Sequence, residues 1–132
     1  VLYDEIKKNG ITKSVRAVVD GINLTVKRNG GQIKVDEITI QQYSMANENI
    51  AVLRYIINKK ALLNYYKGSR GNSAELTAYI KKSVKEYNVN AFCSVNAYKI
   101  LLEKGMLLDF MYQFDNGSFM TSYSIEYKDC NK

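Results

Sequence analysis

The Asn116-Gly117 pair near the C-terminus constrains the fold of this chain more than any other sequence feature. This dipeptide is the preferred centre of a two-residue type I′ hairpin turn. Two runs rich in β-branched and aromatic residues flank it, Met106–Phe114 and Ser118–Tyr127, which predicts a β-hairpin. A two-residue loop fixes the register and places five pairs on one face: Phe114–Phe119, Tyr112–Thr121, Phe110–Tyr123, Leu108–Ile125 and Met106–Tyr127.

The two faces of this predicted hairpin differ in polarity. The residues paired in that register are almost all apolar or aromatic, which indicates that their face packs against the protein core. The intervening positions are mostly polar and indicate a solvent-facing surface; they include Asp109, Gln113, Ser122, Ser124 and Glu126. This alternation is typical of an antiparallel sheet that is covered on one face only.

Helix and strand patterns are also present in the first half of the chain. We expect a short helix over Val1–Lys8, ended by Asn9-Gly10. A second helix is expected over about Thr12–Arg28, where apolar residues recur every three or four positions. Strand-like runs over Ile38–Met45 and Ile50–Ile57 are separated by a short Asn-rich turn, which predicts a first β-hairpin.

Two further helices are expected between the hairpins. Ser73 is a suitable N-cap for the first of them, which ends before Cys93. Its buried stripe is expected to contain Leu76, Tyr79 or Ile80, Val84 and Tyr87, and its solvent-facing side Lys81, Lys82 and Lys85. The second helix, Asn96–Lys104, is expected to stop at Gly105 and to bury Tyr98, Leu101 and Leu102.

The length and composition support one folded domain. At 132 residues, with 46% hydrophobic and 24% charged residues, the chain has the size and polarity of a single globular domain. We therefore predict one exported α+β domain over residues 1–132, with the element order α-β-β-α-α-β-β. Its two hairpins are expected to form a four-stranded antiparallel sheet with helices packed on one face.

The chain contains no histidine, which limits its chemistry. The usual zinc, copper and non-haem iron ligand sets are missing, and so are the His-dependent nucleophile systems. Carboxylates remain as candidates for acid–base work, but Asp36-Glu37 is typical of a turn leading into a strand and Asp109 of a solvent-facing position. We predict a non-enzymatic protein with no catalytic residues, no metal and no cofactor.

Positive charge is concentrated in one window of the chain. The net charge is +6, and between residues 54 and 85 a single acid, Glu75, accompanies eight basic residues: Arg54, Lys59, Lys60, Lys67, Arg70, Lys81, Lys82 and Lys85. The simplest interpretation is a solvated surface of loops and helices. The alternative is a patch that binds an anionic partner, such as a lipid headgroup, a glycan or a nucleic acid.

Cys93 and Cys130 are the two cysteines of the chain. Each follows the end of a predicted element, a helix for Cys93 and the last strand for Cys130, so the two side chains can meet in space. This placement favours a disulfide, and two buried thiols are the alternative. Half of a metal site is the weakest interpretation, because no histidine or further cysteine completes a ligand set. A disulfide would imply an oxidising compartment, which argues against nucleic acid as the usual partner.

The C-terminal half carries a pattern that resembles a known group of proteins. It consists of Phe92-Cys93-Ser94, a short helix ending in glycine over Tyr98–Gly105, then Phe110-Met111-Tyr112 and a closing Asp129-Cys130. This pattern resembles the C-terminal half of small periplasmic proteins of Gram-negative bacteria. The segment Val35–Thr39 is similar to the Val-Asp-x-x-Thr segment before their first strand. The resemblance implies export, a Cys93–Cys130 disulfide and a periplasmic or secreted location.

The start of the chain bears on how the protein reaches its compartment. Because the sequence begins at Val1 rather than Met, we expect that an upstream segment was removed, by a signal peptidase or by design. Any attachment to a membrane would lie in that segment. We predict an envelope protein that binds a protein partner, as a secretion or adhesion accessory or as an immunity or inhibitor factor. The alternative is a binder of an anionic ligand through the basic window.

Overall fold

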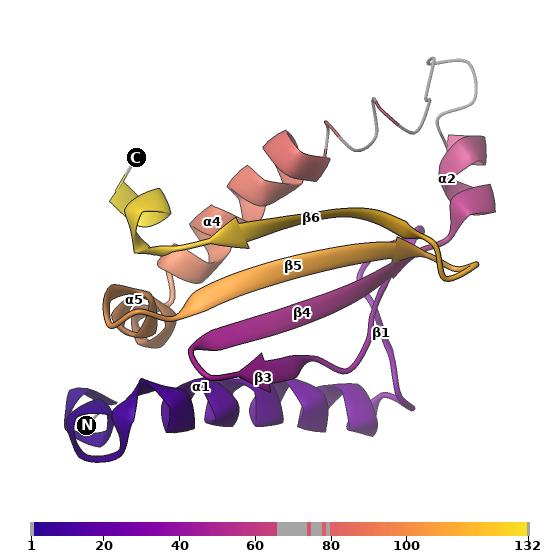
Figure 1. The fold of residues 1–132 in the computed structure, drawn as a ribbon. Coiled ribbons are helices and arrows are strands. Elements are labelled where there is room, and N and C mark those ends of the chain that lie inside the picture. Colours follow the sequence, from indigo (N-terminus) through magenta and orange to yellow (C-terminus); the bar gives the residue numbers. More distant parts are fainter. Residues whose placement is uncertain (1, 66–73, 75–77, 79, 132) are drawn as a thin grey trace.

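The computed structural model describes residues 2–65, 74, 78 and 80–131 of the chain. A twisted sheet forms one layer, and helices form a second layer (Figure 1). The elements are α1 (Leu2–Arg28), β1 (Ile33–Lys34), β2 (Thr39–Gln41), β3 (Met45–Asn47), β4 (Ile50–Ile57), α2 (Lys59–Tyr65), η1 (Ile80–Val84), α4 (Lys85–Cys93), α5 (Asn96–Glu103), β5 (Leu107–Phe114), β6 (Phe119–Ile125) and η2 (Tyr127–Asn131). The strand order is β1-β2-β4-β5-β6, and β3 also pairs with β4.

Helix α1 contains both of the predicted N-terminal helices. Gly10 interrupts it with a non-helical backbone (φ 80°, ψ 164°), which confirms the expected break. The helix ends at Arg28, followed by a Schellman cap in which Gly31 N–H donates to Val26 O (2.9 Å) and Gly30 adopts φ 81°. The predicted apolar stripe faces the core, where the buried residues are Val15, Val19 and Val26.

The first hairpin is confirmed, but its outer strand is broken in two. The single strand predicted over Ile38–Met45 is instead β2 and β3, which pair with opposite ends of β4. The break is at Ser44, whose N–H donates to Asn23 Oδ1 of α1 (2.6 Å) and whose carbonyl accepts from Asn23 Nδ2 (2.9 Å). Because α1 takes both backbone groups of Ser44, they are lost to the β4 ladder, and the register shifts by one residue.

The two hairpins meet through a parallel pair, so the prediction of a purely antiparallel four-stranded sheet is wrong. Strand β5 runs beside β4 in the same direction, from Ile50 opposite Leu107 to Ile57 opposite Phe114. The chain between them, which includes α2, α4 and α5, returns to the starting end of β4 before β5 begins (Figure 1). A return of this kind makes neighbouring strands parallel, and the apolar pattern within each strand does not reveal it.

The second hairpin confirms three of its five predicted pairs. The confirmed pairs have buried side chains; they are Leu108–Ile125, Phe110–Tyr123 and Tyr112–Thr121. The pair Met106–Tyr127 is wrong, because β5 begins after Met106 and Tyr127 already belongs to η2. The central part of the predicted register therefore holds, and its two ends differ.

The turn of this hairpin differs from the predicted two-residue loop. Phe114 N–H donates to Ser118 O (2.8 Å) and Gly117 N–H to Phe114 O (2.9 Å), so the loop has three residues and ends in Gly117 with φ 89°. This loop places Phe119 opposite Gln113 rather than Phe114, and a bulge then restores the predicted register further along. Phe119 therefore points away from the core, with 65% of its surface exposed.

Helix α5 is confirmed with its predicted residues and end. Leu101 and Leu102 are buried and Tyr98 is half-buried. The helix stops before Gly105, which has φ 108°, and Met106 N–H donates to Leu101 O (2.9 Å) as in a Schellman cap.

Helix α4 presents a different side to the core than predicted. Tyr87, expected in the buried stripe, is 73% exposed, whereas Asn88 and Phe92 contact side chains of the sheet. The π-helical turn η1 precedes α4 and holds more residues per turn than an α-helix, so it rotates the following residues away from the 3.6-residue stripe. The expected cap Ser73, the stripe residues Leu76 and Tyr79 and the side chain of Ile80 lie outside the described residues.

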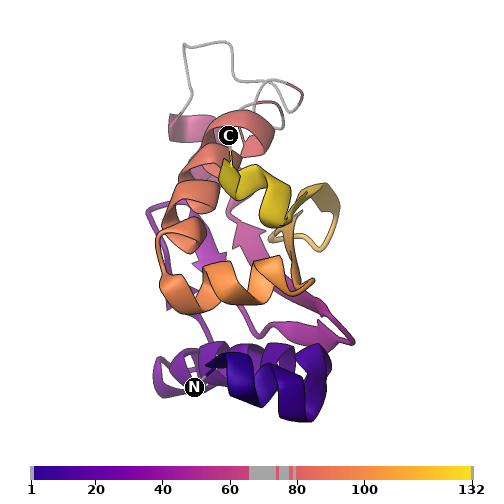
Figure 2. The ribbon, with the colours of Figure 1, turned by 90° about the vertical axis from the view of Figure 1, so that its left-hand side faces the viewer.

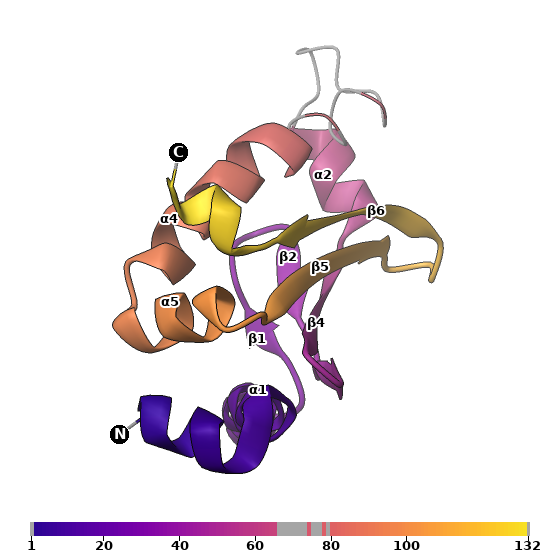
Figure 3. The same ribbon diagram turned by 60° about the vertical axis from the view of Figure 1, so that its left-hand side comes forward.

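The core lies between one face of the sheet and the helices, as expected. Figure 3 shows α1, α4 and α5 along the same side of the strands. Its buried members from the helices are Val15, Val19, Leu62, Leu101 and Leu102, and those from the strands include Ala51, Leu53, Ile57, Leu108, Phe110, Tyr112 and Ile125. Aromatic rings connect the layers, with Phe92 of α4 packed edge-on against Phe110 of β5 (5.6 Å between ring centres).

Candidate interaction surfaces

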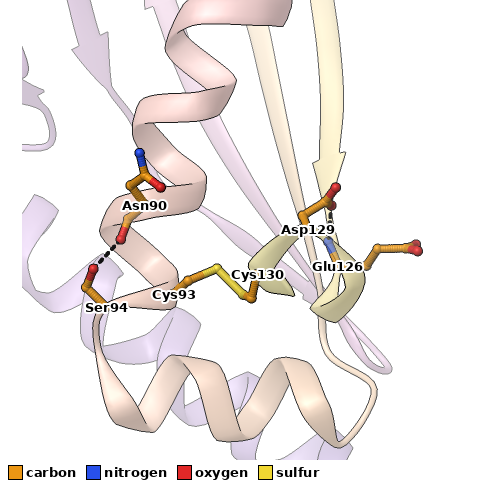
Figure 4. Close-up of a disulfide and its surroundings, with 6 residues drawn as sticks. All are labelled: Asn90, Cys93, Ser94, Glu126, Asp129 and Cys130. Atoms are coloured by element: carbon orange, nitrogen blue, oxygen red, sulfur yellow. Dashed lines mark hydrogen bonds between the residues drawn. A yellow bond between two sulfur atoms is a disulfide. The ribbon is translucent and has the colours of Figure 1, made fainter. Parts of the chain in front are cut away.

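Cys93 and Cys130 form a disulfide, with Cα atoms 5.6 Å apart (Figure 4). Cys93 is the last residue of α4, and Cys130 lies in the short 3₁₀ helix η2 after the last strand. The bond therefore ties the end of the crossover helix to the C-terminal segment, 37 residues later in the chain. This is the pairing that the sequence resemblance implied.

A nearly buried carboxylate holds the turn next to this disulfide. The Asp129 side chain accepts a hydrogen bond from Glu126 N–H (2.9 Å), and Asp129 N–H donates to Glu126 O (3.0 Å) (Figure 4). The closing Asp-Cys of the sequence thus has two structural roles. The aspartate closes the turn from β6 into η2, and the cysteine fixes that turn to α4.

The buried tyrosines form a polar contact inside the aromatic core. Tyr112 Oη and Tyr123 Oη are 3.1 Å apart, and Asn88 Nδ2 donates to Tyr123 Oη (2.7 Å). Burial raises the pKa of Tyr112, Tyr123 and Tyr55 above the ordinary value of 10.0, because the charged phenolate would lose its hydration there. These hydroxyls therefore remain neutral donors and acceptors at physiological pH and connect α4 with the sheet.

The basic residues singled out in the sequence come from different parts of the fold. Arg54 is on the face of β4 that points away from the core, between core-facing neighbours. Lys59 and Lys60 begin α2, where Lys59 Nζ lies 5.2 Å from the ring centre of Phe114. A third group is on η1 and α4 and consists of Lys81, Lys82 and Lys85. Lys67 and Arg70 lie outside the described residues.

A hollow of about 550 Å³ lies beside this third group, and we call it the lysine hollow. Its lining residues are Lys81, Lys82, Lys85, Glu86, Val89, Asn90 and Asp129. Asp129 belongs to η2 and the other six to η1 and α4, so the hollow is at the junction that the disulfide joins. Figure 4 shows two of its lining residues, Asn90 and Asp129, on either side of the disulfide. Lysine ammonium groups and an asparagine amide are donors, and they make the hollow suitable for an anion.

None of the described helices covers the face of the sheet opposite the core. Figures 1 and 2 show α4 and α5 on one side of the sheet and α1 along its β3 edge, which leaves the other side open. The strand register defines the apolar residues of this open face as Ile40, Met45, Ile50, Val52, Ile56, Leu107, Met111 and Phe119. Its polar residues are Lys34, Asn47, Arg54, Asp109, Gln113, Ser122 and Ser124.

Apolar side chains on the open face are paired across strands, and three of them, Met45, Met111 and Phe119, are exposed. Met45 is opposite Val52, and Ile40 is opposite Ile56. Met45 is 59% exposed and Met111 is 37% exposed. The solvent-facing side of a sheet is normally polar, and contiguous exposed apolar residues mark sites that contact other molecules. The open face is therefore the main candidate for an interaction surface.

Sequence reasoning identified the polar residues that the second hairpin contributes to this face, namely Asp109, Gln113, Ser122 and Ser124, but it did not identify the apolar ones. The exposure of Met111 follows from the predicted alternation, since it stands between two core-facing aromatic residues. Met45 and Phe119 carry no such signal. The position of Met45 depends on the break at Ser44, and that of Phe119 depends on the three-residue hairpin loop.

The carboxylates considered for acid–base work have local hydrogen bonds. Asp36 Oδ1 accepts from Ile38 N–H (2.8 Å) and Thr39 N–H (2.7 Å) in the turn before β2, and Asp109 accepts from the Ser124 hydroxyl across β5 and β6. In the described part of the chain, no three residues among His, Cys, Asp and Glu are placed to hold a metal ion. The described helices include none with the length and apolarity needed to cross a membrane.

The fold has counterparts among solved structures. A Pseudomonas aeruginosa protein described as secreted aligns with a TM-score of 0.65 and 11% identity, over 91% of this chain and 96% of that one. The type 2 secretion system pilotin EpsS of Vibrio vulnificus aligns with a TM-score of 0.58 and 12% identity, over 91% and 94% of the two chains. The type II secretion system pilotin AspS of Vibrio cholerae gives 0.55 and 11%, over 91% and 95%.

These similarities establish the α+β architecture, which the chain shares with a secreted protein and with secretion-system pilotins of Gram-negative bacteria. No protein-family model and no curated protein sequence matches the chain.

Proposed function

We propose that this chain is a non-enzymatic accessory protein of the bacterial cell envelope that binds a protein of a secretion system through its open face. The observation that carries the proposal is the exposed apolar content of that face. Met45 and Phe119, from two different strands, each expose more than half of their surface. Exposed apolar groups of this size are costly in water and are covered when a partner binds.

The expected energetics are those of a small protein interface. Burying one large apolar side chain completely contributes about 1.5–3 kcal/mol. A few such anchors dominate most interfaces, and the polar residues around them set the orientation of the partner. On the open face, Met45, Met111 and Phe119 are the natural anchors, and Arg54 stands beside Met111 in the register as a polar contact.

The compartment and the type of partner rest on two further observations. The Cys93–Cys130 disulfide persists in an oxidising compartment, which supports export to the envelope. The similarity of the fold to two pilotins favours a secretion accessory over an immunity or inhibitor factor. The partner we propose is therefore a protein component of a type II secretion system.

Affinity capture from envelope extracts of the host cell tests this function. The bait is the purified, tagged chain with its disulfide intact, and the test variants are Met111→Asp and Phe119→Asp. Tyr87→Asp is the matched control, because Tyr87 is at least as exposed as the two test residues but belongs to α4 on the other side of the sheet. We expect the wild type and the control to recover a secretion-system component, and each test variant to recover about 10- to 100-fold less. Equal recovery by all four proteins contradicts the proposal.

A further inference from the structure

The lysine hollow is a second candidate site, separate from the open face. Three lysines line it together with the carboxylates of Glu86 and Asp129, so basic residues are in excess. None of the three lysines belongs to the Lys34–Glu37 or the Lys128–Glu126 ion pair. A concave site with an excess of one sign of charge attracts a ligand of the opposite sign.

The backbone that carries these lysines is unusual. Lys81 and Lys82 belong to the π-helical turn η1, and Lys85 is the first residue of α4. Consecutive residues of an α-helix point about 100° apart. The wider turn changes this angular spacing, and both consecutive lysines line the same hollow as Lys85. Single π turns inside helices are rare and are frequently found at functional sites.

The other lining residues define the class of ligand. Val89 provides an apolar wall, and the Asn90 side chain provides an amide donor. Glu86 and Asp129 are carboxylates at the same site, and they disfavour a long polyanion such as a nucleic-acid strand. A volume of about 550 Å³ has room for an organic group beside the anion. Lysine is a common phosphate-binding residue, and a phosphate group can accept hydrogen bonds from several donors at once.

We propose that the lysine hollow binds the phosphate group of an organic phosphate, with Lys81, Lys82 and Lys85 holding the anion and Val89 contacting its organic part. The same chemistry is found in a soluble phosphate ester and in the headgroup of an anionic phospholipid. This site differs from the basic patch expected from the sequence. It excludes Arg54, which is on the open face of the sheet, and it includes Asn90 and Asp129.

Titration of the isotope-labelled, disulfide-intact chain with glycerol phosphate, followed by NMR, tests the soluble source. Co-sedimentation with phosphatidylglycerol vesicles, with phosphatidylcholine vesicles as the neutral comparison, tests the lipid source. The test variant is Lys81→Gln/Lys85→Gln. The matched control, Lys13→Gln/Lys27→Gln, removes the same charge from exposed positions of α1. Both variants change surface side chains, so the fold is expected to be retained.

We expect saturable binding in at least one of the two experiments, the NMR titration or the co-sedimentation. The binding affinity should be about tenfold lower in the test variant and unchanged in the control. In the NMR arm, the shifted amides should include those of residues 81–90 and 129. Binding of glycerol phosphate identifies a soluble ester as sufficient, and binding of phosphatidylglycerol vesicles alone identifies a lipid headgroup. No saturable binding in either arm overturns the proposal. Equal weakening in both variants also overturns it, because this would show that only net charge matters.

Discussion

Tyr112 of β5 and Tyr123 of β6 are diagonal neighbours on the core face of the sheet, and their hydroxyl oxygens are 3.1 Å apart. Asn88 of α4 donates a hydrogen bond to the same Tyr123 oxygen (2.7 Å). This three-residue contact joins the crossover helix to the edge of the sheet through polar groups inside an otherwise aromatic core. It also explains why α4 turns Asn88, and not Tyr87, towards the strands.

Removing the central hydroxyl of this contact should destabilise the fold. In Tyr123→Phe, the buried Tyr112 hydroxyl and the Asn88 amide lose their shared partner, which should lower the free energy of unfolding by about 1–3 kcal/mol. Urea denaturation followed by circular dichroism measures the change. The control is Tyr87→Phe, which alters an exposed ring and should stay within about 0.5 kcal/mol of the wild type. If the two variants are equally stable, the contact has no energetic role.

The buried tyrosines predict a loss of stability at high pH. Burial raises the pKa of Tyr55, Tyr112 and Tyr123 above 10.0 in the folded chain, so the folded state holds these protons more tightly than the unfolded state. Their contribution is therefore fully present below about pH 10 and is lost as the pH rises towards the folded-state values. Urea midpoints measured across this range should fall above pH 10. They should fall less steeply in Tyr55→Phe; an identical slope would exclude Tyr55 as a cause.

The disulfide should contribute substantially to stability. It closes a loop between residues 37 positions apart, and the double variant Cys93→Ser/Cys130→Ser should lose about 2–4 kcal/mol of unfolding free energy. The intact mass of the protein purified without reductant should be lower than that of the reduced chain by two hydrogen atoms. A reductant should destabilise the wild type and leave the double variant unchanged. A wild type with two free thiols after export would contradict the assignment.

Two glycines should respond to alanine with opposite signs. Gly117 has φ 89° in the hairpin loop, a conformation that disfavours a side chain, so Gly117→Ala should destabilise the protein by about 1 kcal/mol or more. Gly21 is inside α1, and no atom lies within 4 Å of the position of an added Cβ, so Gly21→Ala should stabilise it by about 0.5–1 kcal/mol. Chemical denaturation of both variants checks the signs. Stabilisation by Gly117→Ala would contradict the three-residue loop.

The elements whose limits depend on local signals could be predicted from the sequence. Gly10, Gly30 and Gly105 each interrupt or end a helix where expected, because the backbone there has a positive φ, which glycine adopts most readily. The central pairs of the second hairpin were also predictable, since side-chain alternation fixes which residues of β5 and β6 share a face.

The features that could not be predicted depend on long-range contacts or on a single extra residue. The break between β2 and β3 requires Asn23, about twenty positions away from Ser44 in the chain. The parallel β4–β5 pair depends on the path of the crossover. The loop before Phe119 shifts the strand pairing by about one residue. The π turn before Tyr87 shifts the buried stripe of the following helix by a similar amount. Either shift is enough to move a side chain between buried and exposed positions. The exposed apolar residues of the open face depend on these shifts, so among them only Met111 was open to prediction.

Site-specific photo-crosslinking in the host cell tests the central claim most directly. A photoreactive residue is introduced at Met111, in the middle of the open face, and at Tyr87, an exposed position of α4. Our account predicts one dominant adduct from position 111 that contains a component of a type II secretion system, and no such adduct from position 87. The absence of an adduct at position 111, or the same adduct from both positions, would contradict it.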